Sequence, residues 1–180
     1  PMYLGKVIDG KIAFRRYSME KPYATVDTGG VQYAGPEIAD ASGPEMKIGL
    51  FGPGAEALAP RLQASGYRIV GVSSEAAWGR ASNELVKLPY DPSVIGLVAT
   101  DRASAHLAGQ IAAKTFVPVI AVSADHTLTS TNIPWIFRLP AGTPGADAVR
   151  CLTDAAARAG RNRQKIRDYL ASGKPVAGKF

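Results

Sequence analysis

The chain has 180 residues, of which 46% are apolar and 20% are charged. This composition is typical of a globular domain with one hydrophobic core, and it excludes a disordered or low-complexity chain. The net charge of +6 arises mainly from lysines and arginines at 6–21 and 150–179, without the interleaved aromatic residues of single-strand binders. These features disfavour nucleic acid as a partner, and no apolar run is long enough to span a membrane.

Residues 1–44 have the pattern of a small antiparallel β-appendage with a linker. Asp9-Gly10 separates two alternating runs, which is a strong hairpin signal because both central residues of a type I′ turn need positive φ. Further short alternating runs surround Gly29-Gly30, and a segment rich in glycine, proline and alanine follows at 35–45. We expect three or four antiparallel strands here, followed by an α/β domain at 45–180.

From residue 46 onward, strand and helix patterns alternate. Strand runs occur at 47–54, 67–75, 94–99, 117–122 and 133–137, and helical patterns occur at 57–66, 76–88, 102–114, 144–160 and 161–173. This order predicts parallel βαβ units, and therefore a Rossmann-like or flavodoxin-like parallel sheet with flanking helices. The basic residues of the last helix are expected to face outward.

One glycine turn supports a nucleotide-binding hypothesis. Gly52-x-Gly54-x-x-Ala57, with the acidic Glu75 about twenty residues further on, fits the dinucleotide-binding fingerprint. In that fingerprint the glycines admit a pyrophosphate to a helix N-terminus, and the acid binds a ribose. However, Pro60 interrupts the predicted helix after one turn. An NAD-type nucleotide-binding enzyme domain is therefore the second hypothesis, with Gly52, Gly54 and Glu75 as its binding residues.

The stretch 94–139 contains the clearest βαβ unit. Thr100 or Asp101 occupies the N-cap position of its helix. Small and apolar residues then recur at helical spacing, namely Ala103, Leu107, Ala108, Ile111 and Ala112. In an open parallel sheet, ligands bind outside the carboxyl ends of the strands. The sequence therefore predicts a binding site at 100–104, at 123–129 and after Leu139.

The same stretch resembles a known family. The helix ASAHLAGQIAA, followed by FVPVIAVSADHTLT and PWIFRLPAGT, is similar to the first lobe of type I periplasmic solute-binding proteins, the branched-chain amino-acid receptor group. The tail RDYLASGKPVAGKF resembles the end of such receptors, so the likeness covers 46–150 and the tail. It implies a receptor or transport role and a periplasmic or extracellular location, while a cytoplasmic location stays open. The receptors have two lobes, whereas 180 residues suffice for one.

The resemblance also implies a set of ligand-binding positions. In such receptors, hydroxyls and backbone N–H groups at the strand ends hold a small ligand, often by its carboxylate. The matching positions are Thr100, Asp101, Ala103 and Ser104 after one strand, and Ser123, Ala124, Asp125, Leu128 and Thr129 after the next. Asp101 and Asp125 depart from this chemistry, since they would repel a carboxylate unless Arg102 compensates. A polar or cationic ligand therefore stays open, and so does a plain capping role for both aspartates.

Catalytic and metal-binding signals are sparse. The lone Cys151 excludes an internal disulfide and a multi-cysteine metal site, and no His/Asp/Glu set at metal spacing, nucleophile elbow or P-loop is present. His106 is expected to be structural, while His126 could contact ligand. Binding of a small solute, without cofactor, metal or chemistry, is therefore favoured over catalysis. A structural protein–protein interaction domain is the third hypothesis, and a homodimer or a further domain would complete a lone lobe.

Overall fold

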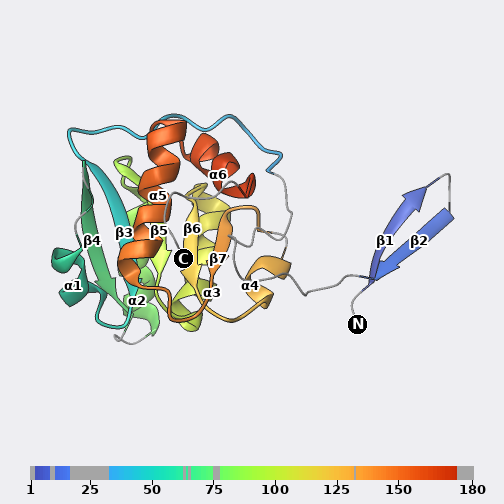
Figure 1. Ribbon diagram of the computed structural model, residues 1–180, viewed down its shortest axis with the longest axis horizontal. Helices are drawn as coiled ribbons and strands as arrows, with labels where there is room; N and C mark the ends of the chain where they lie inside the picture. The colour runs from blue at the N-terminus through green and yellow to red at the C-terminus, as the bar shows by residue number, and fades with distance from the viewer. Residues whose placement is uncertain are drawn as a thin grey trace.

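The computed structural model describes residues 3–8, 11–16, 33–62, 64, 66–74, 78–131 and 133–173. It contains two groups of strands and a set of helices (Figure 1). In chain order the elements are β1 (Tyr3–Ile8), β2 (Lys11–Arg16), β3 (Met46–Gly52), α1 (Ala55–Leu58), the 3-10 helix η1 (Ala59–Arg61), β4 (Tyr67–Ser73), α2 (Trp78–Tyr90), β5 (Val94–Ala99), α3 (Arg102–Thr115), β6 (Val119–Val122), α4 (Thr127–Ser130), β7 (Ile136–Leu139), α5 (Gly145–Ala159) and α6 (Arg163–Ala171).

The appendage contains the predicted hairpin. β1 and β2 pair antiparallel, with Ile8 opposite Lys11, so Asp9-Gly10 lies between the paired ends in sequence although it is outside the described residues. The further strands expected between 17 and 32 also lie outside them. From 33 to 45 the chain forms no strand; Asp40 makes an isolated bridge to Asn162.

The linker that follows packs against the α/β body. The ring of Tyr33 lies 4.9 Å from Trp135 and 5.9 Å from Phe116, measured between centroids. The side-chain amide of Asn162 donates to the carbonyl of Ile38 over 2.7 Å. Residues 33–44 therefore belong structurally to the body, which begins before the boundary expected at residue 45.

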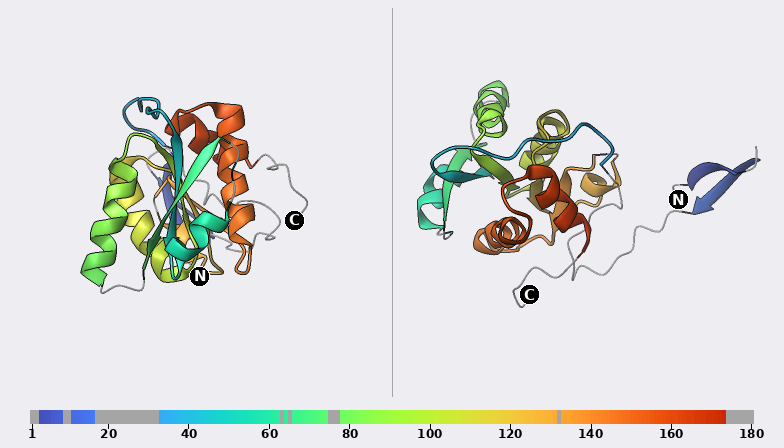
Figure 2. Two further views of the ribbon diagram at one scale, coloured as in Figure 1. Left: turned by 90° about the vertical axis from the view of Figure 1, so that its left-hand side faces the viewer. Right: turned by 90° about the horizontal axis from the view of Figure 1, so that it is seen from above.

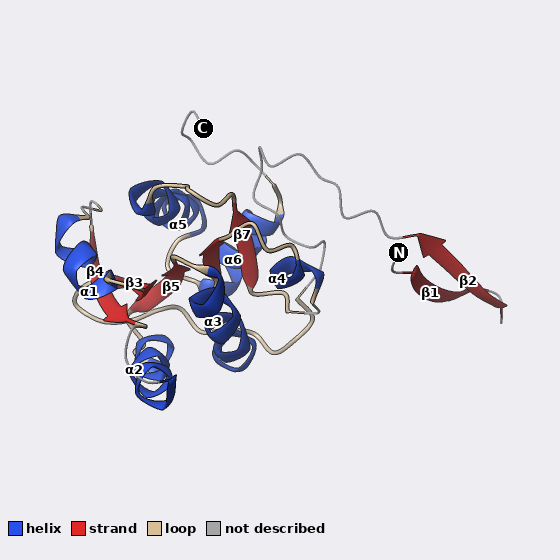
Figure 3. Ribbon diagram, turned by 90° about the horizontal axis from the view of Figure 1, so that it is seen from below, coloured by secondary structure: helices blue, strands red, loops and turns tan. Residues whose placement is uncertain are grey.

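The body is built on a five-stranded sheet in the order β4-β3-β5-β6-β7, with every neighbouring pair parallel. Within the body, β3 is the first strand in sequence. The next strand, β4, lies on one side of it, and β5, β6 and β7 follow in order on the other side. This is the flavodoxin-like order, so the expected fold class is confirmed. Helices α1 and α5 lie on one face of the sheet, and α2 and α3 lie on the other (Figure 3). Within the described residues, no helix has both the length and the apolar character needed to cross a bilayer.

Each face of the sheet has its own hydrophobic core. The inward side of α3 differs in detail from the expected stripe, because Ser104, Ala108 and Ala112 are buried whereas Ala103 is exposed. The difference follows from the position of the N-cap. Helix α3 begins after Asp101, and this start directs Ser104, and the residues one and two turns after it, toward the sheet. Small side chains on this line allow the helix to approach the strands closely.

Helix α6 does not direct all its basic residues outward, and in this respect the expectation was wrong. Arg163 donates from Nε to the carbonyl of Val94 over 2.8 Å and from Nη2 to the carbonyl of Asp91 over 2.9 Å. Arg167 is buried and donates from Nε to the carbonyl of Pro134 over 2.8 Å. The physical reason is that these carbonyls lie at or just before the starts of β5 and β7, and the long arginine side chains supply their hydrogen bonds.

Candidate functional site

The candidate site lies where the loops after β3, β5 and β6 come together. Because the strands are parallel, their carboxyl ends share one edge of the sheet. β5 is hydrogen-bonded to both β3 and β6, so the loop 100–104 is central. The loop 52–54 lies on one side of it and the loop 123–127 lies on the other. The topological switch point, the place where open sheets usually bind ligands, is between β3 and β5.

At this switch point the end of β3 is in close contact with Thr100, the residue that follows β5. The amide of Thr100 donates to the carbonyl of Phe51 over 3.0 Å. A Cβ added at Gly52, whose φ is 155°, would come within 1.8 Å of the Thr100 hydroxyl oxygen. The contact with Thr100 is therefore enough to explain the glycine at position 52.

The other parts of the dinucleotide fingerprint have a different structural context from the one the motif needs. Gly54 has a left-handed φ of 65° and is the N-cap of α1. Helix α1 has four residues and continues as a 3-10 helix that contains Pro60. A helix of this length does not supply the dipole that a pyrophosphate site uses. Glu75 lies outside the described residues.

The loop after β5 is ordered by Asp101. Its carboxylate accepts a hydrogen bond from the amide of Ser104 over 2.7 Å and caps α3, which has 14 residues. Ser104 is 2% exposed, and its hydroxyl oxygen has no hydrogen-bond partner among the described residues. Ala103 lies on the exposed side of the helix. Asp101 therefore has the capping role that the sequence left open, and Ser104 lies beneath the surface.

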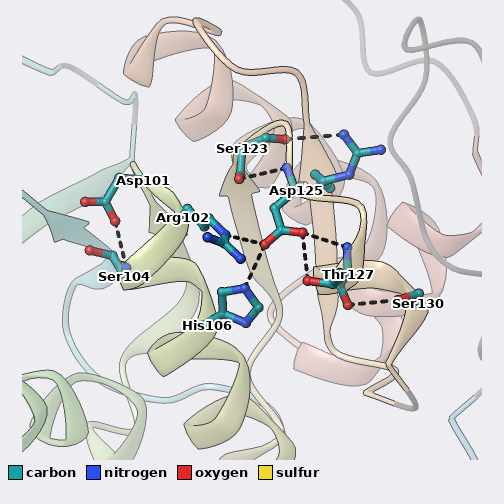
Figure 4. Close-up of polar contacts among 9 residues, drawn as sticks. Asp101, Arg102, Ser104, His106, Ser123, Asp125, Thr127 and Ser130 are labelled. Atoms are coloured by element: carbon teal, nitrogen blue, oxygen red, sulfur yellow. Dashed lines mark hydrogen bonds and ion pairs between the residues drawn. The ribbon is translucent and has the colours of Figure 1, made fainter.

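The centre of the site is the carboxylate of Asp125, which accepts four hydrogen bonds (Figure 4). Its Oδ2 lies 2.5 Å from Arg102 Nε and 2.9 Å from His106 Nε2. Its Oδ1 accepts from the amide of Thr127 over 2.9 Å and from the Thr127 hydroxyl over 2.7 Å. The Arg102 guanidinium, followed by His106 and Thr127, holds the pKa of Asp125 well below its usual range. Asp125 is thus an anion whose acceptor positions are filled.

Exposure differs sharply within this cluster. The side chain of Asp125 is 11% exposed, while those of His106 and Arg102 are 42% and 73% exposed. The two Nη groups of Arg102 make no hydrogen bond to another described residue. The cluster therefore presents hydrogen-bond donors to the surroundings and keeps its carboxylate underneath. The carboxylate of Asp101 is thus engaged as a helix cap, and that of Asp125 is paired with Arg102.

The loop after β6 is held from below. The hydroxyl oxygen of Ser123, a buried residue, accepts from the amide of Asp125 over 3.1 Å, and its carbonyl accepts from Arg138 Nη1 over 3.3 Å. Arg138 Nη2 lies 3.2 Å from His126 Nδ1. A guanidinium only donates, so His126 Nδ1 is the acceptor. Asp125 and His126 thus turn to different partners although they are adjacent in sequence.

The structure places the sequence-predicted residues at different depths. Arg102 and Asp125 meet at the surface, and Ala103 and Ala124 are exposed beside them. Thr100 and Asp101 are half-buried. The other four, Ser104, Ser123, Leu128 and Thr129, are buried, with Leu128 in the core cluster of Trp135 and Ile136. No group of three metal-ligating side chains occurs in the part of the chain that the structure describes.

Sequence reasoning missed two partners of Asp125. His106 is four residues after Arg102, a spacing that puts both side chains on one side of a helix. Thr127 follows Asp125 by two residues, which is the spacing of an Asx-turn. Both spacings can be recognised in the sequence. Neither spacing indicates that Arg102 and His106 contact Asp125, the residue in the loop after β6.

No protein-family model and no curated protein sequence matches this chain. Solved structures similar to it include the following two. One is an ABC transporter substrate-binding protein from Desulfitobacterium hafniense, with 16% identity, a TM-score of 0.44, and coverage of 76% of this chain and 50% of the other. The second is an ABC transporter substrate-binding protein from Desulfitobacterium hafniense in complex with Leu, with 13% identity, a TM-score of 0.40, and coverage of 72% and 48%. The chain thus spans about half the length of the substrate-binding proteins that it resembles.

Proposed function

We propose that this chain binds a small polar solute at the carboxyl edge of its sheet, as a receptor or sensory module similar to one lobe of a type I periplasmic binding protein. The site comprises the loops 100–104 and 123–129. In this proposal the chain serves solute recognition in transport or sensing, in a periplasmic or extracellular location. A second lobe, from a further domain or a second copy, would cover the rest of the solute.

The filled carboxylate of Asp125 is the observation that carries the proposal. Four donors satisfy its oxygens, so it has no acceptor position left for a cation. The Nη groups of the exposed Arg102 are left to form hydrogen bonds elsewhere. A guanidinium binds carboxylates through paired, charge-assisted hydrogen bonds. We therefore propose that the solute carries a carboxylate or another small anionic group.

The histidine of the cluster positions the carboxylate of Asp125. His106 donates from Nε2 to Asp125 Oδ2 over 2.9 Å. In this proposal the solute is bound and not converted. The pair as it stands orients the guanidinium of Arg102 through their shared carboxylate.

A thermal-shift screen tests the proposal. The panel contains amino acids, small carboxylic acids, aromatic acids, amines and nicotinamide nucleotides. A solute at a hundred times its dissociation constant should stabilise the folded state by about 2.7 kcal/mol, and we expect the shift from an acid. Arg102→Ala should abolish this shift, while Lys114→Ala, a control at the far end of the same helix, should keep it.

Three results would contradict the proposal. A shift from amines alone would place a cation in the site. A shift from nicotinamide nucleotides that Gly54→Ala removes would favour the nucleotide hypothesis. A hit that is consumed during incubation, followed by NMR, would identify an enzyme.

A further inference from the structure

The two edges of the sheet are covered to different degrees. All four residues of β7, one edge strand, are buried. In β4, the other edge strand, no residue is buried, although six of its seven residues are partly covered. Figure 2 (left) shows β4 from its outer side, with α1 drawn next to its lower end. Among the described residues, the sheet is therefore more exposed at β4 than at β7.

Edge strands of monomeric proteins usually carry features that prevent pairing, such as proline, a bulge or several charges. β4 pairs with β3 in regular register over all seven residues and contains no proline. Its one charged residue is Arg68, which lies 3.8 Å from Glu45 of the same chain. The outer side of β4 thus has the regular geometry needed to accept another strand.

Apolar side chains flank this edge on both faces of the sheet. Tyr67 and Ile69 are partly covered on the face of α1, and Val70 and Val72 are partly covered on the face of α2. Helix α1 covers the later half of β4, because a Cβ at Gly71 would come within 2.2 Å of the Ala55 carbonyl oxygen. At the start of β4, Ala64 forms an isolated bridge with Tyr67, and the amide of Tyr67 donates to the carbonyl of Ala64 over 3.0 Å.

We propose that β4 is a self-association surface, at which the β4 strands of two copies pair antiparallel about a two-fold axis at Val70 and form one continuous sheet. The occupant is a second copy because the strand is self-complementary about this residue. Val70 meets Val70 of the second copy, and Ile69 lies opposite the small Gly71, where the α1 of that copy covers it. The β-branched pair and the bulky-opposite-small pair are both favourable across antiparallel strands.

Charge agrees with this arrangement. Arg68 lies opposite Val72 of the second copy, so the two Arg68 positions are four residues apart along the strands, or about 14 Å. This separation exceeds the screening length of about 8 Å at physiological salt. The pairing thus places no like charges opposite each other, and it joins residues 68–72 of the two copies, because the amide of Tyr67 already donates to the carbonyl of Ala64.

Disulfide trapping tests this pairing directly in the full chain. Residues opposite each other in antiparallel strands have Cα atoms about 4.5–5.5 Å apart, which suits a disulfide. Val70→Cys should therefore cross-link into a dimer on mild oxidation, whereas Arg80→Cys, exposed on α2, should not. Cys151 is buried and does not compete. Cross-linking of both variants to the same extent would overturn the proposal.

Charge variants provide a second test that does not depend on oxidation. Val70→Lys and Val70→Glu should each weaken the dimer about tenfold, since like charges then lie opposite each other, and mixing the two should restore it. Recovery in the mixture shows that both variants fold. Sedimentation that finds the unaltered chain monomeric at high micromolar concentration, or Val70→Lys as strongly dimeric as the unaltered chain, would overturn the proposal.

Discussion

The two ends of the parallel strands use similar residues for different purposes. At the amino end, Asp91 pairs with Lys47 over 2.7 Å, and Arg163 donates to two backbone carbonyls. At the carboxyl end, Asp125 pairs with Arg102 over 2.5 Å, and the Nη groups of Arg102 extend outward. The two clusters thus differ in the acceptors that their arginine N–H groups reach. At the amino end the acceptors are backbone carbonyls of the protein, whereas at the carboxyl end the Nη groups of Arg102 face the surroundings.

Burial explains this contrast. Burial lowers the pKa of the Arg163 guanidinium. Its hydrogen bonds go to the backbone carbonyls of Val94 and Asp91. Arg102 keeps most of its side chain in solvent, so its ion pair with Asp125 contributes little to stability. The amino end thus stabilises the fold, and the carboxyl end leaves the guanidinium of Arg102 exposed.

The largest effect is expected from Arg167→Ala at the amino end. The substitution removes the donor to the Pro134 carbonyl and leaves a cavity beneath α6, so the free energy of unfolding should fall by about 3 kcal/mol. Urea denaturation measures this change. Lys165→Ala, exposed on the same helix, should change it by less than about 0.5 kcal/mol. Equal effects of the two substitutions would contradict a stabilising amino end.

A smaller effect is expected from Asp91, whose pKa is lowered from 3.8 to about 2, chiefly by its hydrogen bond to Lys47. A lowered folded-state pKa stabilises the protein above the unfolded value, and this stability is lost as the pH falls toward 2. After allowance for partial exposure we expect a loss of about 1 kcal/mol between about pH 5 and pH 2.

Denaturation of Asp91→Asn across the same pH range measures this contribution. The variant should start less stable and lose less on acidification than the unaltered chain, while Glu84→Gln, an exposed acid on α2, should follow the unaltered chain. If Asp91→Asn and the unaltered chain show the same pH dependence, the ion pair with Lys47 has no role in stability.

The smallest effect on stability is expected at the carboxyl end. Asp125→Asn keeps an oxygen for Thr127 but removes the charge that pairs with Arg102, and it should cost less than about 1 kcal/mol. An anionic solute should still bind to this variant, because Arg102 then has no carboxylate to share. Calorimetry with the solute from the screen checks this. A stability loss as large as that of Arg167→Ala would remove the contrast between the two ends.

The sequence by itself determined the alternation of strands and long helices in the body, and with it the fold class. Helix α2 buries Ala81, Leu85 and Leu88 as its pattern predicts, and β5 is buried along its whole length. The order of the strands in the sheet was harder to predict from the sequence, because neighbouring strands are distant in sequence. β3 lies between β4 and β5 owing to the crossover handedness and helix packing, which no local pattern states.

The position of the loops that form the candidate site could also be predicted. Loops after parallel strands meet at one edge, so the segments 100–104 and 123–129 were predictable from alternation alone. Which side chains meet there was decided by tertiary structure. Asp125 joins Arg102 and His106 across 23 and 19 residues, and Arg163 reaches the Val94 carbonyl across 69. The periodicity of a sequence indicates which face of a helix or strand is apolar. The partners of a side chain across the sheet depend on how the elements pack. Packing therefore decided that the acceptor positions of Asp125 are occupied and that Arg102 is exposed.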